Sequence, residues 1–314
     1  MMHALCFAAS RVSTGRWLAM AVALAAANMS SHSHGAPAPV AAAADTMVQM
    51  AHISVQVVGQ GSSVILIPGL SSPRATWDGV VPALAKNHRV YLVQVNGFGG
   101  DDPRGNLQPG ILDGIVDDLH TLITGAKLGA VPLVGHSMGG LVSLMLARAH
   151  PEDVQKALIV DALPFIGAIF APAATAEMLK PQAEMMRNQM ASLYGKPFPD
   201  AVGQMIAQQN ALKPASRATL AGWSAKADMR VSGQALYEDM TTDLRPELAK
   251  IAAPITVLVP WTDARGGEAS VLGMYRAQYA GAPKVTIQGV GDSGHFIMLD
   301  QPEIFARRLA EFLG

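Results

Sequence analysis

The ten residues Val131-Pro-Leu-Val-Gly-His-Ser-Met-Gly-Gly140 decide the fold of this chain. An apolar run typical of a buried strand leads directly into a Gly-x-Ser-x-Gly turn, and apolar residues at helical spacing follow it. Small residues must flank the serine in so sharp a turn, and Gly135 and Gly139 supply them. The context therefore predicts a strand, a tight turn and a helix. The Ser137 hydroxyl would stand clear of the sheet, beside a helix N-terminus.

Strands and helices alternate on both sides of this turn. Further β-branched or alternating runs typical of strands lie at residues 52–58, 63–67, 90–95, 157–160, 255–259 and 285–287. Helical spacing of apolar residues covers 111–123, continues from 141, and returns after Pro302. The alternation predicts an α/β fold with a mostly parallel, doubly wound sheet that is covered by helices on both faces.

The alternation stops between residues 164 and 248, where helical patches occur without a convincing strand. We expect a helical lid inserted between a first core segment, 45–163, and a second, 249–314. An ordinary pair of long helices in the sheet domain is the alternative. The stretch is rich in methionine, a side chain that fills irregular space. This richness indicates either an adaptable apolar pocket or closely packed lid helices. The seven methionines of the stretch are Met178, Met185, Met186, Met190, Met205, Met229 and Met240.

Residues 1–44 contain no acidic residue and have the pattern of a secretory signal peptide followed by an Ala/Pro-rich linker. Arg11 and Arg16 precede the apolar run 17–27, which is too short to span a bilayer. An amphipathic surface helix is the alternative. We expect export to a bacterial periplasm or medium, without stable membrane insertion after cleavage. The single cysteine, Cys6, excludes a disulfide scaffold.

Composition excludes several classes of protein. Half of the 314 residues are hydrophobic, 15% are charged and the formal net charge is −1. A chain so apolar and so nearly neutral is not disordered, and the absence of a Lys/Arg field argues against binding to nucleic acid. We expect a small-molecule substrate. The His-containing stretch 31–35 is interpreted as a polar linker, and no metal site is expected.

A serine hydroxyl needs a base, and the base needs a carboxylate that holds its tautomer. His295 lies in a glycine-rich loop after the last predicted strand, at the same sheet edge as Ser137. Asp263 follows the strand 255–259 and is the predicted acid. Asp161, which ends the preceding strand, and Asp292, close to the histidine, are the alternatives. His136 is interpreted as pocket wall or as structural.

Acyl transfer also needs two donors for the developing oxyanion. The N–H of Met138, which follows the nucleophile, is one candidate. The N–H of Leu70, in the loop after the strand 63–67, is the other; a plain strand-to-helix loop is the alternative there. Trp77, which follows the loop of Leu70, and Phe98, which follows the strand 90–95, are the candidate substrate-binding residues.

Four motifs together resemble the α/β-hydrolase superfamily, in its lid-bearing, esterase-like branch, over about residues 50–314. They are Pro68-Gly-Leu70, Asn96-Gly-Phe-Gly-Gly100, the turn 135–140 and the pair Asp263 and His295. The superfamily usually has His-Gly where this chain has Pro68-Gly69. The resemblance implies a triad of Ser137, Asp263 and His295, no cofactor, and a pocket between lid and sheet.

The expected activity is hydrolysis of an apolar carboxylic ester through an acyl-enzyme. A serine at the turn argues against the dehalogenases and epoxide hydrolases of this fold, which use an aspartate nucleophile. Amide, lactone or carbon–carbon bond hydrolysis is the alternative, and so is a non-catalytic, ligand-binding relative. A peptidase would need an amine-binding carboxylate in the lid. Glu177 and Glu184 are candidates, although two surface glutamates explain the same residues.

Overall fold

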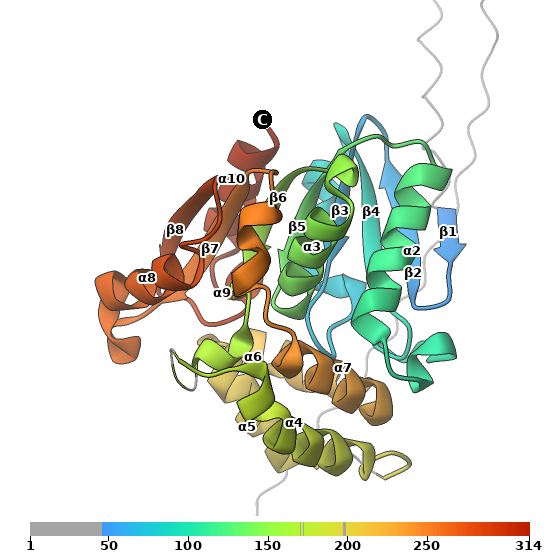
Figure 1. Cartoon of the computed structure of the whole chain (residues 1–314). Coiled ribbons are helices and arrows are strands. Elements are labelled where there is room, and N and C mark those ends of the chain that lie inside the picture. Colours follow the sequence, from blue (N-terminus) through green and yellow to red (C-terminus); the bar gives the residue numbers. More distant parts are fainter. Residues whose placement is uncertain (1–45, 170, 172, 197–198) are drawn as a thin grey trace, which may run out of the picture. The chain divides into compact units, whose positions relative to one another are not determined.

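The computed structural model describes residues 46–314 except 170, 172 and 197–198; the predicted signal peptide and linker lie outside the described residues. An eight-stranded sheet in the order β1-β2-β4-β3-β5-β6-β7-β8 forms the centre (Figure 1). β1 and β2 pair antiparallel with their neighbours, and all other pairs are parallel, which confirms the predicted sheet. The strands are β1 Thr46–Gln49, β2 Ile53–Gly59, β3 Ser62–Ile67, β4 His88–Val95, β5 Val131–His136, β6 Val154–Val160, β7 Ile255–Trp261 and β8 Val285–Gly291.

Two hydrophobic cores, one on each face of the sheet, explain the unbroken apolar strands. Successive strand residues point to opposite faces, so Ile65 and Ile67 join one core while Val64 and Leu66 join the other. The first core lies under α2 (Ile111–Gly125), α3 (Met138–Ala149) and α8 (Gly267–Gln278). The second lies under α1 (Val81–Leu84), α9 (Ile297–Asp300) and α10 (Pro302–Leu313).

The segment between β6 and β7 is helical. It contains α4 (Ala176–Ala191), α5 (Asp200–Asn210), α6 (Pro214–Ser224) and α7 (Met229–Thr241), and its described residues include no strand. α4 packs along α7, and α5 packs along α6. The two pairs join different cores, because Val231 and Ala235 of α7 belong to the first core, whereas Ala207 and Leu220 of α5 and α6 belong to the second.

Helix α7 is fixed to the sheet domain by polar contacts. The carboxylate of Glu238 accepts hydrogen bonds from the backbone N–H groups of Gly110 (2.7 Å) and Leu112 (2.8 Å), at the start of α2. An acidic group at this position satisfies N–H groups that have no acceptor inside α2, and it complements the helix dipole. The N–H of Asp228 donates to the carbonyl of Gly97 at 2.7 Å. α7 therefore belongs to the predicted lid segment, 164–248, and is held by contacts with the sheet domain.

Short 3-10 turns complete the described fold: η1 Arg74–Trp77, η2 Arg104–Leu107, η3 Pro151–Asp153, η4 Ile166–Ile169, η5 Arg245–Lys250 and η6 Asp263–Arg265. Within the part of the chain that the structure describes, no helix is both long and apolar enough to cross a membrane.

Candidate active site

Ser137 occupies the tight turn between β5 and α3 that the sequence predicts. Its backbone lies at φ 52° and ψ −125°, a conformation that residues with a side chain rarely adopt. A Cβ on Gly135 would lie 2.2 Å from the carbonyl oxygen of Gly139, and one on Gly139 would lie 2.3 Å from that of Ile67. Both glycines are therefore required by close backbone contacts, and the turn presents Ser137 at the end of the sheet.

His295 lies in the loop between β8 and α9, as expected. The fully buried Asp300 holds this loop by accepting a hydrogen bond from the Gly294 N–H at 2.9 Å. His136 is also fully buried, and its Nε2 donates to the carbonyl oxygen of His295 at 3.1 Å. Burial, together with the nearby His295, lowers the pKa of His136 well below its usual value, so His136 stays neutral. Its role is structural: it fixes the backbone of the base.

Asp161 is the carboxylate that pairs with the base. Its Oδ2 lies 2.5 Å from Nδ1 of His295. Asp161 follows the last residue of β6, and the register of the parallel pair places His136 opposite Val160. Ser137 and Asp161 therefore leave adjacent strands side by side, and the Ser137 N–H donates to the Val160 carbonyl at 3.0 Å.

Asp263, the acid predicted from the sequence, is not the partner of His295. β7 continues past Leu258, which is level with Val160 in β6, and runs on to Trp261 against β8. This extension carries Asp263 beyond the sheet edge into the exposed turn η6. Asp292 is exposed as well. The carboxylate paired with His295 is thus Asp161, which corrects the predicted pairing with Asp263.

Tyr275 on α8 is a site residue that the sequence analysis missed. Its hydroxyl donates to Oδ1 of Asp161, so each carboxylate oxygen has one donor. Burial and the neighbouring Asp161 raise the pKa of Tyr275 well above its usual value, so the phenol keeps its proton. A tyrosine at helical spacing on an amphipathic helix carries no signal of this role in the sequence.

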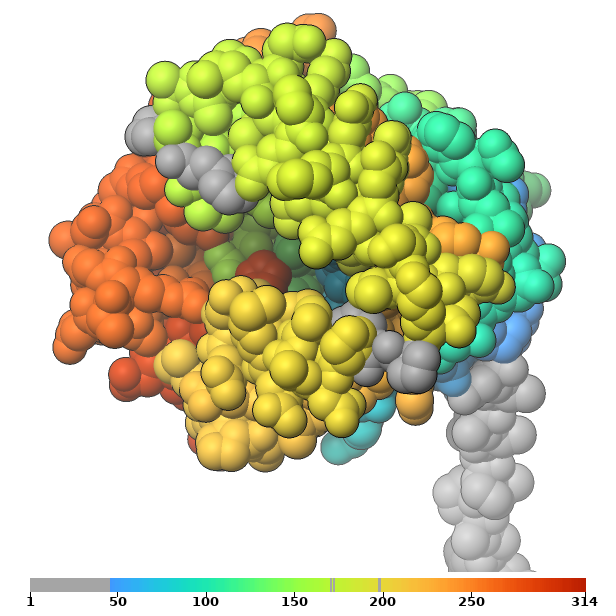
Figure 2. All heavy atoms as spheres, turned by 90° about the horizontal axis from the view of Figure 1, so that it is seen from below, coloured from blue at the N-terminus to red at the C-terminus, as the bar shows by residue number. Residues whose placement is uncertain are grey.

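These groups line one cavity of about 70 Å³, which matches roughly two water molecules of liquid. The view from the lid side shows a hollow among the lid helices, with atoms of the C-terminal part at its floor (Figure 2). Most of the remaining wall is apolar, which suits a small hydrocarbon group. The lining residues are Ser137, Met138, Leu141, Asp161, Ala162, Leu163, Ile166, Ile169, Asp239, Tyr275 and His295.

The two predicted oxyanion donors lie in segments that meet at Ser137. A Cβ on Gly69 would lie 3.0 Å from Cβ of Ser137, so the loop before Leu70 passes directly beside the nucleophile. Among the described residues, neither the Leu70 N–H nor the Met138 N–H has a hydrogen-bond acceptor. Both are therefore free to bind an oxyanion, and they remain the predicted donors.

Trp77 and Phe98, the predicted substrate contacts, are core residues instead. Both are 0% exposed, and neither lines the catalytic cavity. Trp77 stacks on Phe305 of α10 with ring centroids 6.0 Å apart, in the second core. Phe98 belongs to the first core. Large aromatic side chains bury the most apolar area, and here that use explains both residues.

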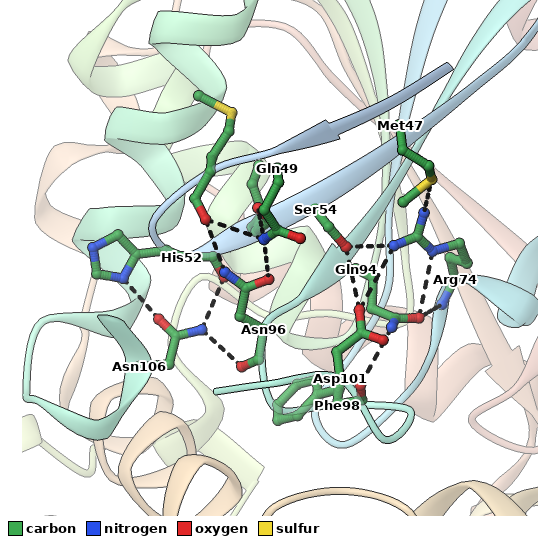
Figure 3. A network of polar contacts seen from close by, with 12 residues as sticks. Met47, Gln49, His52, Ser54, Arg74, Gln94, Asn96, Phe98, Asp101 and Asn106 are labelled. Atoms are coloured by element: carbon green, nitrogen blue, oxygen red, sulfur yellow. Dashed lines mark hydrogen bonds and ion pairs between the residues drawn. The ribbon is translucent and has the colours of Figure 1, made fainter. Parts of the chain in front are cut away.

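Arg74 joins the loop after β3 to the neighbouring strands β4 and β2 (Figure 3). Its guanidinium donates to Ser54 Oγ on β2 at 2.5 Å and lies 3.9 Å from the carboxylate of Asp101. Its backbone N–H donates to the side-chain oxygen of Gln94 at 3.1 Å. Burial lowers the pKa of Arg74 and the charge of Asp101 raises it, with burial the larger effect. The network supports the loop that carries Leu70 without entering the cavity.

Asp239 on α7 is a second carboxyl group in the cavity. Its side chain is 6% exposed, and it has no hydrogen-bond or ion-pair partner among the described residues. Burial raises its pKa to about 7, although the neighbouring His295 acts in the opposite direction. No sequence pattern singles out Asp239, because an aspartate on a helix is usually exposed and only the folded arrangement buries this one.

The raised pKa of Asp239 makes the stability of the fold depend on pH. Folded chains keep this proton up to about pH 7, whereas the usual carboxyl value is 3.8, so the folded state binds more protons between these values. Stability therefore falls as pH rises through that window and is constant above it. Relative to Asp239→Asn, the wild-type free energy of unfolding should fall by about 3 kcal/mol from pH 5 to pH 8. Urea titrations of both proteins measure this difference, and parallel pH profiles would contradict it.

One group in the described part of the chain has the composition of a metal site: His120, His150 and Glu152. The two imidazole rings are stacked with centroids 3.8 Å apart and planes inclined by only 14°. A metal ion binds in the plane of an imidazole ring, so nearly parallel stacked rings do not direct their lone pairs at one ion. Nδ1 of His120 lies 2.7 Å from Asp153, which ties α2 to η3. This arrangement fits a structural contact.

The other lid residues singled out in the sequence lie away from the cavity. Glu177 is exposed and pairs with Lys180, and Glu184 is exposed. None of the seven lid methionines lines the cavity, and three of them, Met178, Met185 and Met205, are exposed. Their number therefore does not describe the substrate pocket.

Comparisons with known proteins concern the family and the fold of this chain. A model of the Alpha/beta hydrolase family matches residues 64–308. A pimeloyl-(acyl-carrier protein) methyl ester esterase from Aeromonas hydrophila is 34% identical over 112 residues, which cover 36% of this chain and 42% of that protein. The chain therefore spans about two fifths of the length of that relative.

Two solved structures show the same fold at low sequence identity. An esterase from Exiguobacterium antarcticum is 18% identical, with a TM-score of 0.69 over 83% of this chain and 94% of that one. An enol-lactonase from Burkholderia xenovorans is also 18% identical, with a TM-score of 0.66 over 83% and 96% of the two chains.

Proposed function

Because the chain belongs to the alpha/beta hydrolase family, we propose that it hydrolyses small carboxylic esters through Ser137, His295 and Asp161. The observation that carries the proposal is the contact of 2.5 Å between Nδ1 of His295 and Asp161, in one cavity with Ser137. A histidine held in this way has Nε2 free to accept the serine proton. The partial match to a methyl ester esterase supports the choice of ester.

The chemistry proceeds in two balanced steps. Ser137 Oγ attacks the ester carbonyl while His295 takes its proton, and the N–H groups of Leu70 and Met138 stabilise the oxyanion. The imidazolium then gives that proton to the departing alkoxide, which leaves an acyl-serine and a free alcohol. Water next attacks the acyl-serine with the same base, and collapse releases the carboxylic acid and restores Ser137. Asp161 stabilises the imidazolium in both steps.

The cavity supports a short acyl group. Its volume of about 70 Å³ admits only a few heavy atoms with the lid in this position. We expect hydrolysis of p-nitrophenyl esters to be fastest for acyl chains of roughly two to four carbons, the range that such a volume admits.

Labelling and substrate profiling together test the proposal. A fluorophosphonate should add its phosphonyl mass to the peptide that contains Ser137, and the short esters should be turned over faster than the matching anilides and lactones. If no adduct forms, the protein is a non-catalytic relative. If anilides or lactones are cleaved faster than esters, the proposed substrate class is wrong and is the one cleaved fastest.

A further inference from the structure

The carboxyl group of Asp239 lines the cavity that contains Ser137 and His295, yet the described residues give it no hydrogen-bond or ion-pair partner. Burying a polar group without a partner costs free energy, and the cost is larger for a charge. Nothing in the proposed ester chemistry uses this group, because Asp161 already pairs with the base.

The helix that carries Asp239 is held by contacts at two positions that precede this residue in α7. The adjacent residue, Glu238, accepts two backbone hydrogen bonds from the start of α2. Two turns earlier on the same face, Ser232 Oγ accepts a hydrogen bond at 2.8 Å from the hydroxyl of Ser71, in the loop that carries Leu70. Asp239 is therefore held beside the reacting groups, in the lining of the cavity.

The charges in the cavity decide which substrate group suits Asp239. The ionisable lining residues are Asp161, Asp239, Tyr275 and His295, and the lining includes no lysine or arginine. Asp161 is paired with His295, so the cavity has one carboxyl group, that of Asp239, without a cationic partner. The cavity therefore attracts a cation and repels an anion.

We propose that Asp239 is a specificity-determining residue that binds an ammonium group on the acyl part of the ester substrate. The inference rests on the proposed ester hydrolysis and names its substrate class, an amino-acyl ester with a short aliphatic spacer. The ammonium supplies the missing donors and the counter-charge, while the apolar wall formed by Leu141, Leu163 and Ile166 contacts the spacer. A substrate that neutralises Asp239 removes the cost of burying its charge.

Matched substrates give the test. Ethyl esters of ω-amino acids with one to three methylenes are compared at pH 7.5 with alkyl esters that have a methyl in place of the ammonium, and with mono-ethyl esters of dicarboxylic acids. At the best spacer length, wild-type kcat/KM should favour the amino ester over its alkyl match by about tenfold or more, mainly through KM. The anionic esters should be the poorest substrates.

Two variants that each remove one negative charge distinguish an effect of the Asp239 site from an effect of the protein's net charge. Asp239→Asn should reduce the preference for the amino ester by about tenfold, the effect of a lost charged hydrogen bond. Asp263→Asn, which alters an exposed acid outside the cavity, should leave the preference unchanged. Equal preferences in wild type and Asp239→Asn, or a wild-type preference for alkyl or anionic esters, would overturn the inference.

The failure of this inference is distinguishable from failure of the proposed function. If alkyl esters are hydrolysed with dependence on Ser137 but no amino ester is preferred, only the role of Asp239 is wrong. If no ester is hydrolysed and Ser137 takes up no fluorophosphonate, the ester chemistry itself is wrong. Should Asp239→Asn fail to fold, competition in the wild type decides: propylammonium must inhibit alkyl-ester hydrolysis more strongly than propanol, and equal inhibition would refute the assignment.

Discussion

Replacing Ser137 with alanine should reduce kcat for a short ester by about a millionfold, the typical cost of losing a triad nucleophile. No other hydroxyl or thiol with a paired base lines the described cavity, since the phenol of Tyr275 donates to Asp161. Alanine and serine experience the same strain at φ 52°, so the turn should survive. Turnover of p-nitrophenyl butyrate and thermal unfolding measure the two effects.

Ser143→Ala is the matched control for this change. Ser143 is fully buried in α3, the helix that follows Ser137, and its hydroxyl donates to the Gly139 carbonyl at 2.8 Å without lining the cavity. Its loss should cost about 1 kcal/mol of stability and less than tenfold in kcat. A folded Ser137→Ala protein that keeps a tenth of wild-type turnover would refute the nucleophile assignment.

Asp161→Asn should lower kcat by about ten-thousandfold, as in a comparable serine triad. The asparagine amide cannot stabilise the imidazolium, and its NH₂ group favours the tautomer of His295 that cannot accept the serine proton. Tyr275 would still contact one side of the residue, so the fold should be retained. Steady-state turnover with a saturating short ester measures the loss.

Asp263→Asn makes the same chemical change at the position that the sequence favoured. Asp263 is exposed in η6, so we expect kcat within about twofold of wild type, in line with a surface substitution. A crippling effect of Asp263→Asn together with a mild effect of Asp161→Asn would show that the acid comes from β7 after all.

The difference between Asp161 and Asp263 shows what a single sequence reveals about this site. Local patterns located both residues after buried strands, because β-branched runs and turns are local signals. The choice between them depends on how far β7 extends past β6, which is a matter of register between strands almost a hundred residues apart. A local pattern does not fix the last residue of a strand, and the extension of β7 from the predicted end at 259 to Trp261 is part of what moves Asp263 beyond the sheet edge.

The turn at Ser137 was predictable for the opposite reason. Its strained backbone and its two required glycines lie within five consecutive residues. Trp77 and Phe98 were assigned to the pocket because they follow loops near the site, but only packing shows that both rings face the cores. Tyr275 and Asp239 come from helices in which hydrogen-bond partners, or their absence, depend on the folded arrangement.

The division of the lid between two cores limits how this protein can be engineered. Truncating residues 164–248 to widen the pocket would uncover apolar side chains on both faces of the sheet, and it would remove the Glu238 cap from α2. Such a deletion would create an aggregation-prone protein in place of an open enzyme. Changes in substrate scope are better sought by replacing single wall residues, Leu163, Ile166 or Ile169, which line the cavity without carrying the attachment of α7.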